Sequence, residues 1–154
     1  MATWDEFARS EPEFARLIQA RFDSHKHKML ATLRKDGSPR ISGIEATFAD
    51  GQLWLGMMPG SLKALDLQRD PRLALHSAPL DSEMANGDAK ISGRAIEHTD
   101  EATMTAFAGA VKDASGRTCL RACFSSSRST FARSYSPAWR LITYGSTRGA
   151  KGGD

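Results

Sequence analysis

The sequence is poor in the features on which several classes of protein depend. It has only two cysteines, Cys119 and Cys123, too few for a disulfide framework and compatible with a reducing cytoplasm, where we expect the protein to reside. No apolar run approaches the ~20 residues that a membrane helix requires. The first residues, MATWDEFARSEPEF, are acidic and amphipathic, unlike a signal peptide. We therefore expect no membrane partner.

Metal ligands at metal-binding spacing are also lacking. None of the four histidines has a cysteine or carboxylate at the spacing of a metal site, and no catalytic triad is visible, so we predict no metal. The net charge of +3 is mild. A small basic barrel that binds nucleic acid is the least favoured hypothesis, because Trp54 and Phe48 are explained as core or dimer contacts rather than as exposed stacking residues.

Residues 4–23 predict a helix with a break near Ser10. Thr3 with Glu6, and Ser10 with Glu13, each match a capping box, and Pro12 fits a first helical turn. Apolar side chains at helical spacing predict one buried stripe, made of Phe14, Ala15, Leu17, Ile18 and Phe22. We assign residues 1–24 to an N-terminal helical segment.

The segment 29–57 predicts an antiparallel meander. Asp-Gly steps within 35–38 and 49–51 accept the positive φ of tight turns, and they join strands at 29–34, 39–48 and 52–57. Gly43 and Gly93 mark bulges or close backbone approaches. Further strands are predicted at 73–77, 89–97 and 139–144, with an edge strand within 119–133. Helices are predicted at 62–68 and from Thr99 or Asp100 to 111.

This order of elements predicts a mainly β fold with flanking helices. Residues 1–154 form a single domain with a flexible tail at 145–154, and six or seven strands make a small closed or split barrel. The best candidate for chemistry is the step from Pro59 to Lys63. A helix N-terminus there offers free amides to an anion, and Ser61 and Lys63 add a hydroxyl and a cation. A plain capped helix with a surface lysine is the alternative at this point.

Residues 25–98 resemble the pyridoxamine 5′-phosphate oxidase-like family. The resemblance lies in the ordered set DGSPRISGIEATFADGQLWLGMMPGSLKALDLQRDPRLAL, followed by AKISGRA. In that family, two strands joined by a turn are followed by a Ser-x-Lys step, a short helix, an Asp-Pro-Arg step and a further strand. The resemblance implies a six- to seven-stranded antiparallel split β-barrel, FMN-binding-protein-like. It also implies a homodimer with the cofactor at the subunit interface. Family members bind FMN or the 8-hydroxy-5-deazaflavin coenzyme, and a few bind haem.

The resemblance also implies site residues. Ser61 and Lys63 would hold the cofactor phosphate, and Ser42 would lie beside the ring system with the backbone of Gly43 and Ile44. The remaining candidates are Met57 and Met58 at a strand end, Lys90 and Ser92 on a later strand, and Arg40 as an additional charge.

Departures from the family pattern bear on the cofactor. FMN-binding oxidases of the family carry an arginine at the position of Ser42, a lysine near Thr47 and an arginine at the position of Leu62, so three charge-assisted contacts are missing. This favours the deazaflavin. The sequence thus predicts an oxidoreductase that transfers a hydride between a deazaflavin or FMN cofactor and an unidentified small substrate. The alternative is a non-catalytic binder of a flavin, deazaflavin or haem.

Overall fold

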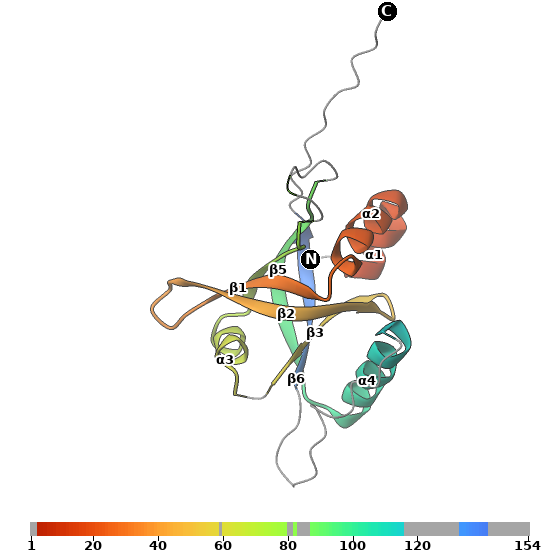
Figure 1. The fold of residues 1–154 in the computed structure, drawn as a ribbon. Coiled ribbons are helices and arrows are strands. Elements are labelled where there is room, and N and C mark those ends of the chain that lie inside the picture. Colours follow the sequence, from red (N-terminus) through yellow and green to blue (C-terminus); the bar gives the residue numbers. More distant parts are fainter. Residues whose placement is uncertain (1–2, 59, 80–81, 83–86, 116–132, 142–154) are drawn as a thin grey trace, which may run out of the picture.

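An antiparallel sheet that curls into a barrel forms the centre of the protein (Figure 1). The computed structural model describes residues 3–58, 60–79, 82, 87–115 and 133–141. Its strands are His27–Leu33 (β1), Pro39–Ala49 (β2), Gln52–Met57 (β3), Arg72–His76 (β4), Lys90–His98 (β5) and Arg133–Leu141 (β6). They pair in the order β1-β2-β3-β6-β5-β4, and β4 pairs with β1 to close the barrel. The mainly β, antiparallel fold class is confirmed, whereas the strand predicted within 119–133 falls almost entirely outside the described residues.

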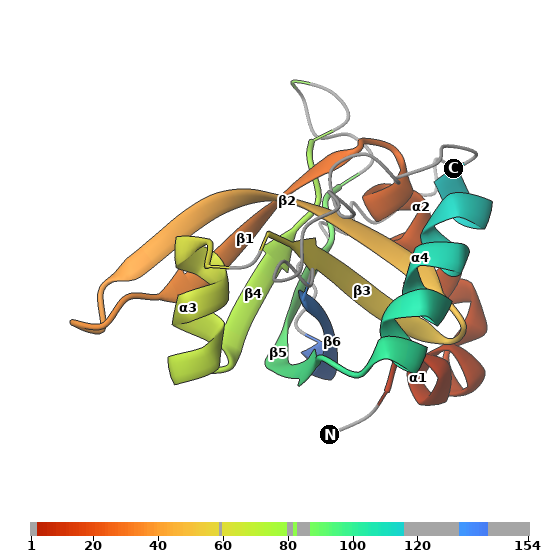
Figure 2. The same cartoon turned by 90° about the horizontal axis from the view of Figure 1, so that it is seen from below.

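Helices flank this sheet. They are Trp4–Ser10 (α1), Pro12–Asp23 (α2), Leu62–Arg69 (α3) and Glu101–Ser115 (α4). Both views place α3 and α4 on opposite sides of the barrel (Figures 1 and 2). Within the described ranges, no helix combines the length and apolar character needed to cross a membrane.

The predicted break near Ser10 separates α1 from α2. The capping box of Thr3 and Glu6 is confirmed, because each side chain accepts the other's backbone N–H. The capping box of Ser10 and Glu13 is wrong. The N-cap of α2 is Glu11, because Pro12 begins the helix, and the Ser10 hydroxyl donates instead to the carbonyl of Phe7.

The two N-terminal helices pack onto Phe48 of β2. The rings of Trp4 and Phe22 lie 4.4 and 5.9 Å from that of Phe48, measured between centroids. The predicted stripe is confirmed only in part, since Phe14 and Leu17 are exposed. The largest fully buried apolar side chains of the described core are Phe22, Leu30, Leu53, Leu55, Leu75 and Ile91.

Strand β2 pairs with one neighbour along its first part and with another along its second part. Residues 39–45 pair with β1, and residues 46–49 pair with β3. The β2–β3 hairpin is confirmed, with Asp50 and Gly51 at φ values of 49° and 69°, as a two-residue turn of positive φ requires. Gly43 pairs with Met29 in unbroken register, so the bulge considered there does not form. Among the described residues, 39–45 pair with no second strand, and Lys63 and Asp66 of α3 contact Gly43 and Arg40 there.

Strand β6 differs from its prediction. It begins at Arg133 and contains Pro137, whereas the sequence predicted that the last strand begins at residue 139. Pro137 pairs with Ala95 of β5, whereas β6 pairs with β3 only over residues 133–135. Because proline has no backbone N–H, it is tolerated in a strand that has an unpaired side.

Candidate functional site

The chain turns from β3 into α3 through Gly60 and Ser61. Gly60 has a φ of 71°, and Ser61 is the N-cap of α3 in extended conformation. The helix is confirmed, but the side-chain cap is wrong, because the Ser61 hydroxyl bonds none of the helix amides. This hydroxyl is buried and has no hydrogen-bond partner among the described residues. Such a group costs roughly 1–3 kcal/mol when left unsatisfied, so it is available to a ligand at the helix N-terminus.

Lys63 ties α3 to the edge of β2 that β3 leaves unpaired. Its Nζ donates to the carbonyl of Gly43 at 2.7 Å. An ammonium has three donors, so this contact leaves two for an anion. A Cβ built on Gly43 would meet nothing within 4 Å, which shows open space beside the strand at this point. The structure therefore brings Ser61, Lys63 and Gly43 into one region.

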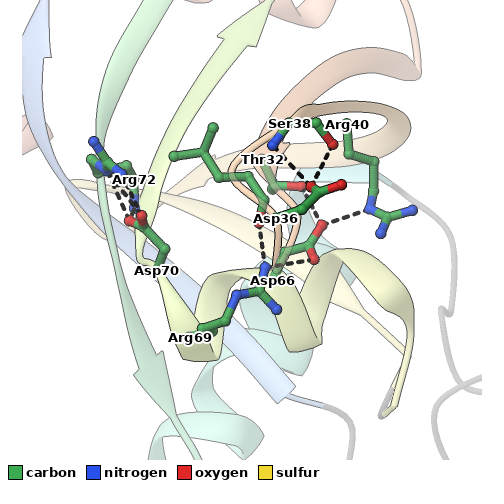
Figure 3. A network of polar contacts seen from close by, with 9 residues as sticks. Thr32, Asp36, Ser38, Arg40, Asp66, Arg69, Asp70 and Arg72 are labelled. Atoms are coloured by element: carbon green, nitrogen blue, oxygen red, sulfur yellow. Dashed lines mark hydrogen bonds and ion pairs between the residues drawn. The ribbon is translucent and has the colours of Figure 1, made fainter.

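Asp66 anchors α3 to the barrel (Figure 3). Its side chain is 4% exposed, and its carboxylate accepts hydrogen bonds from Thr32 Oγ1 at 2.9 Å, Arg40 Nε at 2.6 Å and Arg69 Nη2 at 3.0 Å. Burial alone would raise the pKa of Asp66, but the hydrogen bonds from Arg40, Arg69 and Thr32 outweigh burial and lower it below its ordinary value. Sequence reasoning missed this residue.

Arg40 therefore has a structural partner. Its bond to Asp66 uses Nε, and its side chain remains 19% exposed. Among the described residues, no partner is found for its two terminal amino groups. Arg69 closes the network from the other end of α3 by donating to the carbonyl of Leu33 as well. The position and tilt of α3 are thus fixed by charged contacts to both β1 and β2.

A depression of about 300 Å³ lies on the outer face of β2, β1, β4 and β5. The lining residues are Met29, Ala31, Ile41, Ala74, Leu75, His76, Lys90 and Ser92. Met29 pairs with Gly43 on one side and with His76 on the other. Gly43, which accepts from Lys63, is thus the strand partner of a residue that lines the depression.

One wall of this depression is charged. His76 Nε2 lies 2.7 Å from Asp88 Oδ2, and Lys90 Nζ lies 3.4 Å from the same oxygen. Sequence reasoning named Lys90 and Ser92 but missed His76 and Asp88. The spacing of 12 residues between the histidine and the aspartate gives no sequence signal, and only the pairing of β4 with β5 brings them together.

The other predicted site residues lie in different environments. Ile44 and Met57 are 3% and 4% exposed in the barrel core, so they offer a ligand little beyond their backbone. Met58 is 72% exposed, and Ser42 is half-buried on the inward-facing side of β2. Among the described residues, no group of three potential metal ligands was found.

The curled antiparallel barrel, with α3 directly after its third strand, is consistent with the split-barrel fold expected from the sequence. A family model described as pyridoxamine 5′-phosphate oxidase matches residues 14–135. The match spans most of the chain, and the protein belongs to this family. No curated protein matches the sequence significantly.

Solved structures share the fold at low sequence identity. A conserved hypothetical protein of Mycobacterium tuberculosis superposes with a TM-score of 0.63 at 19% identity, over 92% of this chain and 94% of that one. A Listeria innocua protein named for pyridoxamine 5′-phosphate oxidase gives 0.55 at 18% identity, over 81% and 94%. A haem-binding protein of Mycobacterium smegmatis gives 0.51 at 19% identity, over 79% and 50%.

Proposed function

We propose that this protein binds a phosphate-bearing cofactor, the 8-hydroxy-5-deazaflavin coenzyme or FMN, and serves as an oxidoreductase acting on a small substrate. The buried, unpartnered hydroxyl of Ser61 at the N-terminus of α3 carries this proposal. Membership of a family described as pyridoxamine 5′-phosphate oxidase supports the redox chemistry.

The residues at the start of α3 fit a phosphate group. The Ser61 hydroxyl, the first amides of α3 and two donors of the Lys63 ammonium all belong to the start of this helix. Bonding a phosphate would satisfy the Ser61 hydroxyl, which has no partner among the described residues. The open space beside Gly43 leaves room for the rest of the cofactor to continue toward the depression.

The charges present favour the deazaflavin over FMN. Lys63 supplies one cation at the N-terminus of α3, and Arg40 supplies a second only through its terminal amino groups, because its Nε is bound to Asp66. The phosphodiester group of the deazaflavin coenzyme carries less charge than the phosphate monoester of FMN, so it needs fewer cations at this point of the site. We therefore retain the deazaflavin as the first choice.

A second copy of the chain completes the proposed site. Ile41 is 69% exposed and Met29 is 49% exposed on the outer face of the barrel, beside the depression. Burying these side chains against a partner would remove apolar surface from water and enclose a cofactor ring. The homodimer predicted from the family resemblance fits this surface.

The cofactor, when bound, supplies hydride chemistry. The chain's own residues bind and orient the cofactor: Ser61 and Lys63 hold the phosphate end, and the exposed side chain of Ile41 excludes water from the ring beside the depression. A non-catalytic carrier of the same cofactor is the alternative. Haem is less well supported, since His76 is the histidine that lines the depression and both of its ring nitrogens face other groups.

Side-by-side titration of the full chain with FMN, the deazaflavin coenzyme and haem tests the proposal. We expect Lys63→Ala to weaken binding of the preferred flavin by more than about 1.5 kcal/mol, the low end for a hydrogen bond to a charged group. Lys35→Ala, in the exposed β1–β2 turn, removes the same charge and should leave binding unchanged.

Riboflavin lacks the phosphate, so its binding reports only the contacts that the site makes with the rest of the cofactor. Its affinity should be the same for the wild type and Lys63→Ala. Equal losses for FMN and riboflavin, or an unchanged dissociation constant for both phosphorylated cofactors, would contradict the phosphate assignment. Reduction and reoxidation of the bound cofactor by a small acceptor then distinguishes an enzyme from a carrier.

A further inference from the structure

The charged wall of the depression is not used by the proposed phosphate site. It consists of His76 on β4, Asp88 before β5 and Lys90 on β5. The Asp88 side chain is 6% exposed, whereas those of His76 and Lys90 are 37% and 42% exposed. A buried carboxylate thus holds two basic side chains at the surface of an otherwise apolar hollow.

The contacts of His76 occupy both of its ring nitrogens. Its Nε2 faces the Asp88 carboxylate, and its Nδ1 faces the carbonyl oxygen of Ser77. Lys90 on the neighbouring strand approaches the same carboxylate. Of the two basic side chains, Lys90 is therefore the one that keeps donors for a ligand.

The donors that face the depression are on β5. Lys90 and Ser92 are two residues apart, so their side chains share a face of the strand, and both line the depression. Lys90 Nζ approaches Asp88 only at 3.4 Å, which leaves its other N–H groups for a ligand. His76 has no such donor left, and it acts here by holding Asp88 in place.

We propose that Lys90 and Ser92 bind the carboxylate of a small apolar or aromatic acid, whose hydrocarbon part lies on Met29, Ala31 and Ala74. This names the substrate class of the proposed oxidoreductase, and to that extent it rests on the proposed function. The Lys90 ammonium at this wall disfavours a cationic ligand. The apolar floor gives a polyanion or a sugar few partners, and the hollow of about 300 Å³ admits a single ring.

Benzoate is the probe, and benzamide is its neutral isostere. Each is titrated at millimolar concentrations into the isotopically labelled full chain without cofactor, and binding is followed by the amide signals of Met29, Ala31 and Ser92. We expect benzoate to shift these signals and to bind at least about fivefold more tightly than benzamide, because only benzoate makes the charge-assisted contact.

Variants locate the contact. Lys90→Met should lower the affinity for benzoate by about fivefold and leave that for benzamide unchanged, and Ser92→Ala should act in the same direction with a smaller loss. Lys35→Met makes the same substitution in the exposed β1–β2 turn and should change neither affinity. The spectrum of each variant reports whether the fold is retained.

Several results would overturn the proposal. These are equal affinities for benzoate and benzamide, no binding of benzoate, shifts confined to residues 61–63, or equal losses in Lys90→Met and Lys35→Met. The cofactor titrations are independent of this test. Benzoate binding to a chain that binds no flavin would support the acid site and reject the proposed function, and flavin binding without benzoate binding would do the reverse.

Discussion

Replacing Asp66 with asparagine should destabilise the protein substantially. The buried carboxylate accepts from two guanidinium groups and one hydroxyl, and asparagine keeps the shape but removes the charge. Breaking a buried ion pair costs roughly 3–5 kcal/mol. Arg40 and Arg69 are 19% and 37% exposed, so water recovers part of their solvation, and we expect a loss of about 2–3 kcal/mol at pH 7.

This loss should depend on pH. The hydrogen bonds to Asp66 keep its pKa below the ordinary value of 3.8 despite burial. A carboxyl with a depressed pKa in the folded state adds stability above its unfolded pKa, and this stability disappears as pH falls through the folded pKa. The difference between the wild type and Asp66→Asn should therefore be full above about pH 5 and shrink below about pH 3.8.

Urea unfolding followed by the fluorescence of the buried Trp4 and Trp54 measures this difference. Asp70→Asn is the matched control, because Asp70 pairs with the exposed Arg72 just after the same helix. Its stability at pH 7 should stay close to that of the wild type. A loss for Asp66→Asn no larger than that of the control, or one that does not change between pH 7 and pH 3, would refute the role assigned to Asp66.

Three further changes test other parts of the structure. Ser61→Ala should leave the free energy of unfolding unchanged or raise it by up to about 1 kcal/mol, because no hydrogen bond is lost. The affinity for the flavin should fall. A lower free energy of unfolding in denaturant would contradict the finding that the hydroxyl has no partner among the described residues. Gly51→Ala should lower the free energy of unfolding by about 1–3 kcal/mol, which is more than Gly37→Ala should. Both glycines have positive φ, but only at Gly51 would an added Cβ meet another side chain, 2.9 Å from Asp5 Cβ. Ile41→Glu should convert the proposed dimer to a monomer in sedimentation experiments, whereas Ile96→Glu, at another exposed position away from the depression, should not.

Local sequence signals were sufficient for the elements that depend on neighbouring residues. The Asp50-Gly51 turn, the capping box of Thr3 and the helix after Ser61 are each encoded within a few positions. Asp100 likewise caps α4 by accepting from the amide of Thr103. Errors arose where a local preference was overridden by pairing at a distance. Pro137 signals a turn by itself, but β5 holds it within a strand.

The site was harder to predict because it depends on contacts between distant segments. His76 and Asp88 meet only because β4 and β5 are antiparallel neighbours. Ile44 and Met57 follow the motif in sequence, yet strand alternation turns their side chains into the core. In contrast, Ser61 and Lys63 lie within one turn of a helix start, so the sequence alone placed them together.

The contacts of Arg40 bear on how the proposed phosphate site would work with few cations. A guanidinium has five donors in a rigid fork, so a bond from Nε to Asp66 fixes its plane without using its terminal amino groups. The same carboxylate positions α3 through Thr32 and Arg69, and α3 carries Ser61 and Lys63. Asp66 therefore holds both the helix N-terminus and the additional cation in fixed positions. A lysine at position 40 would keep the charge but lose this orientation, so the contribution of residue 40 to anion binding depends on arginine.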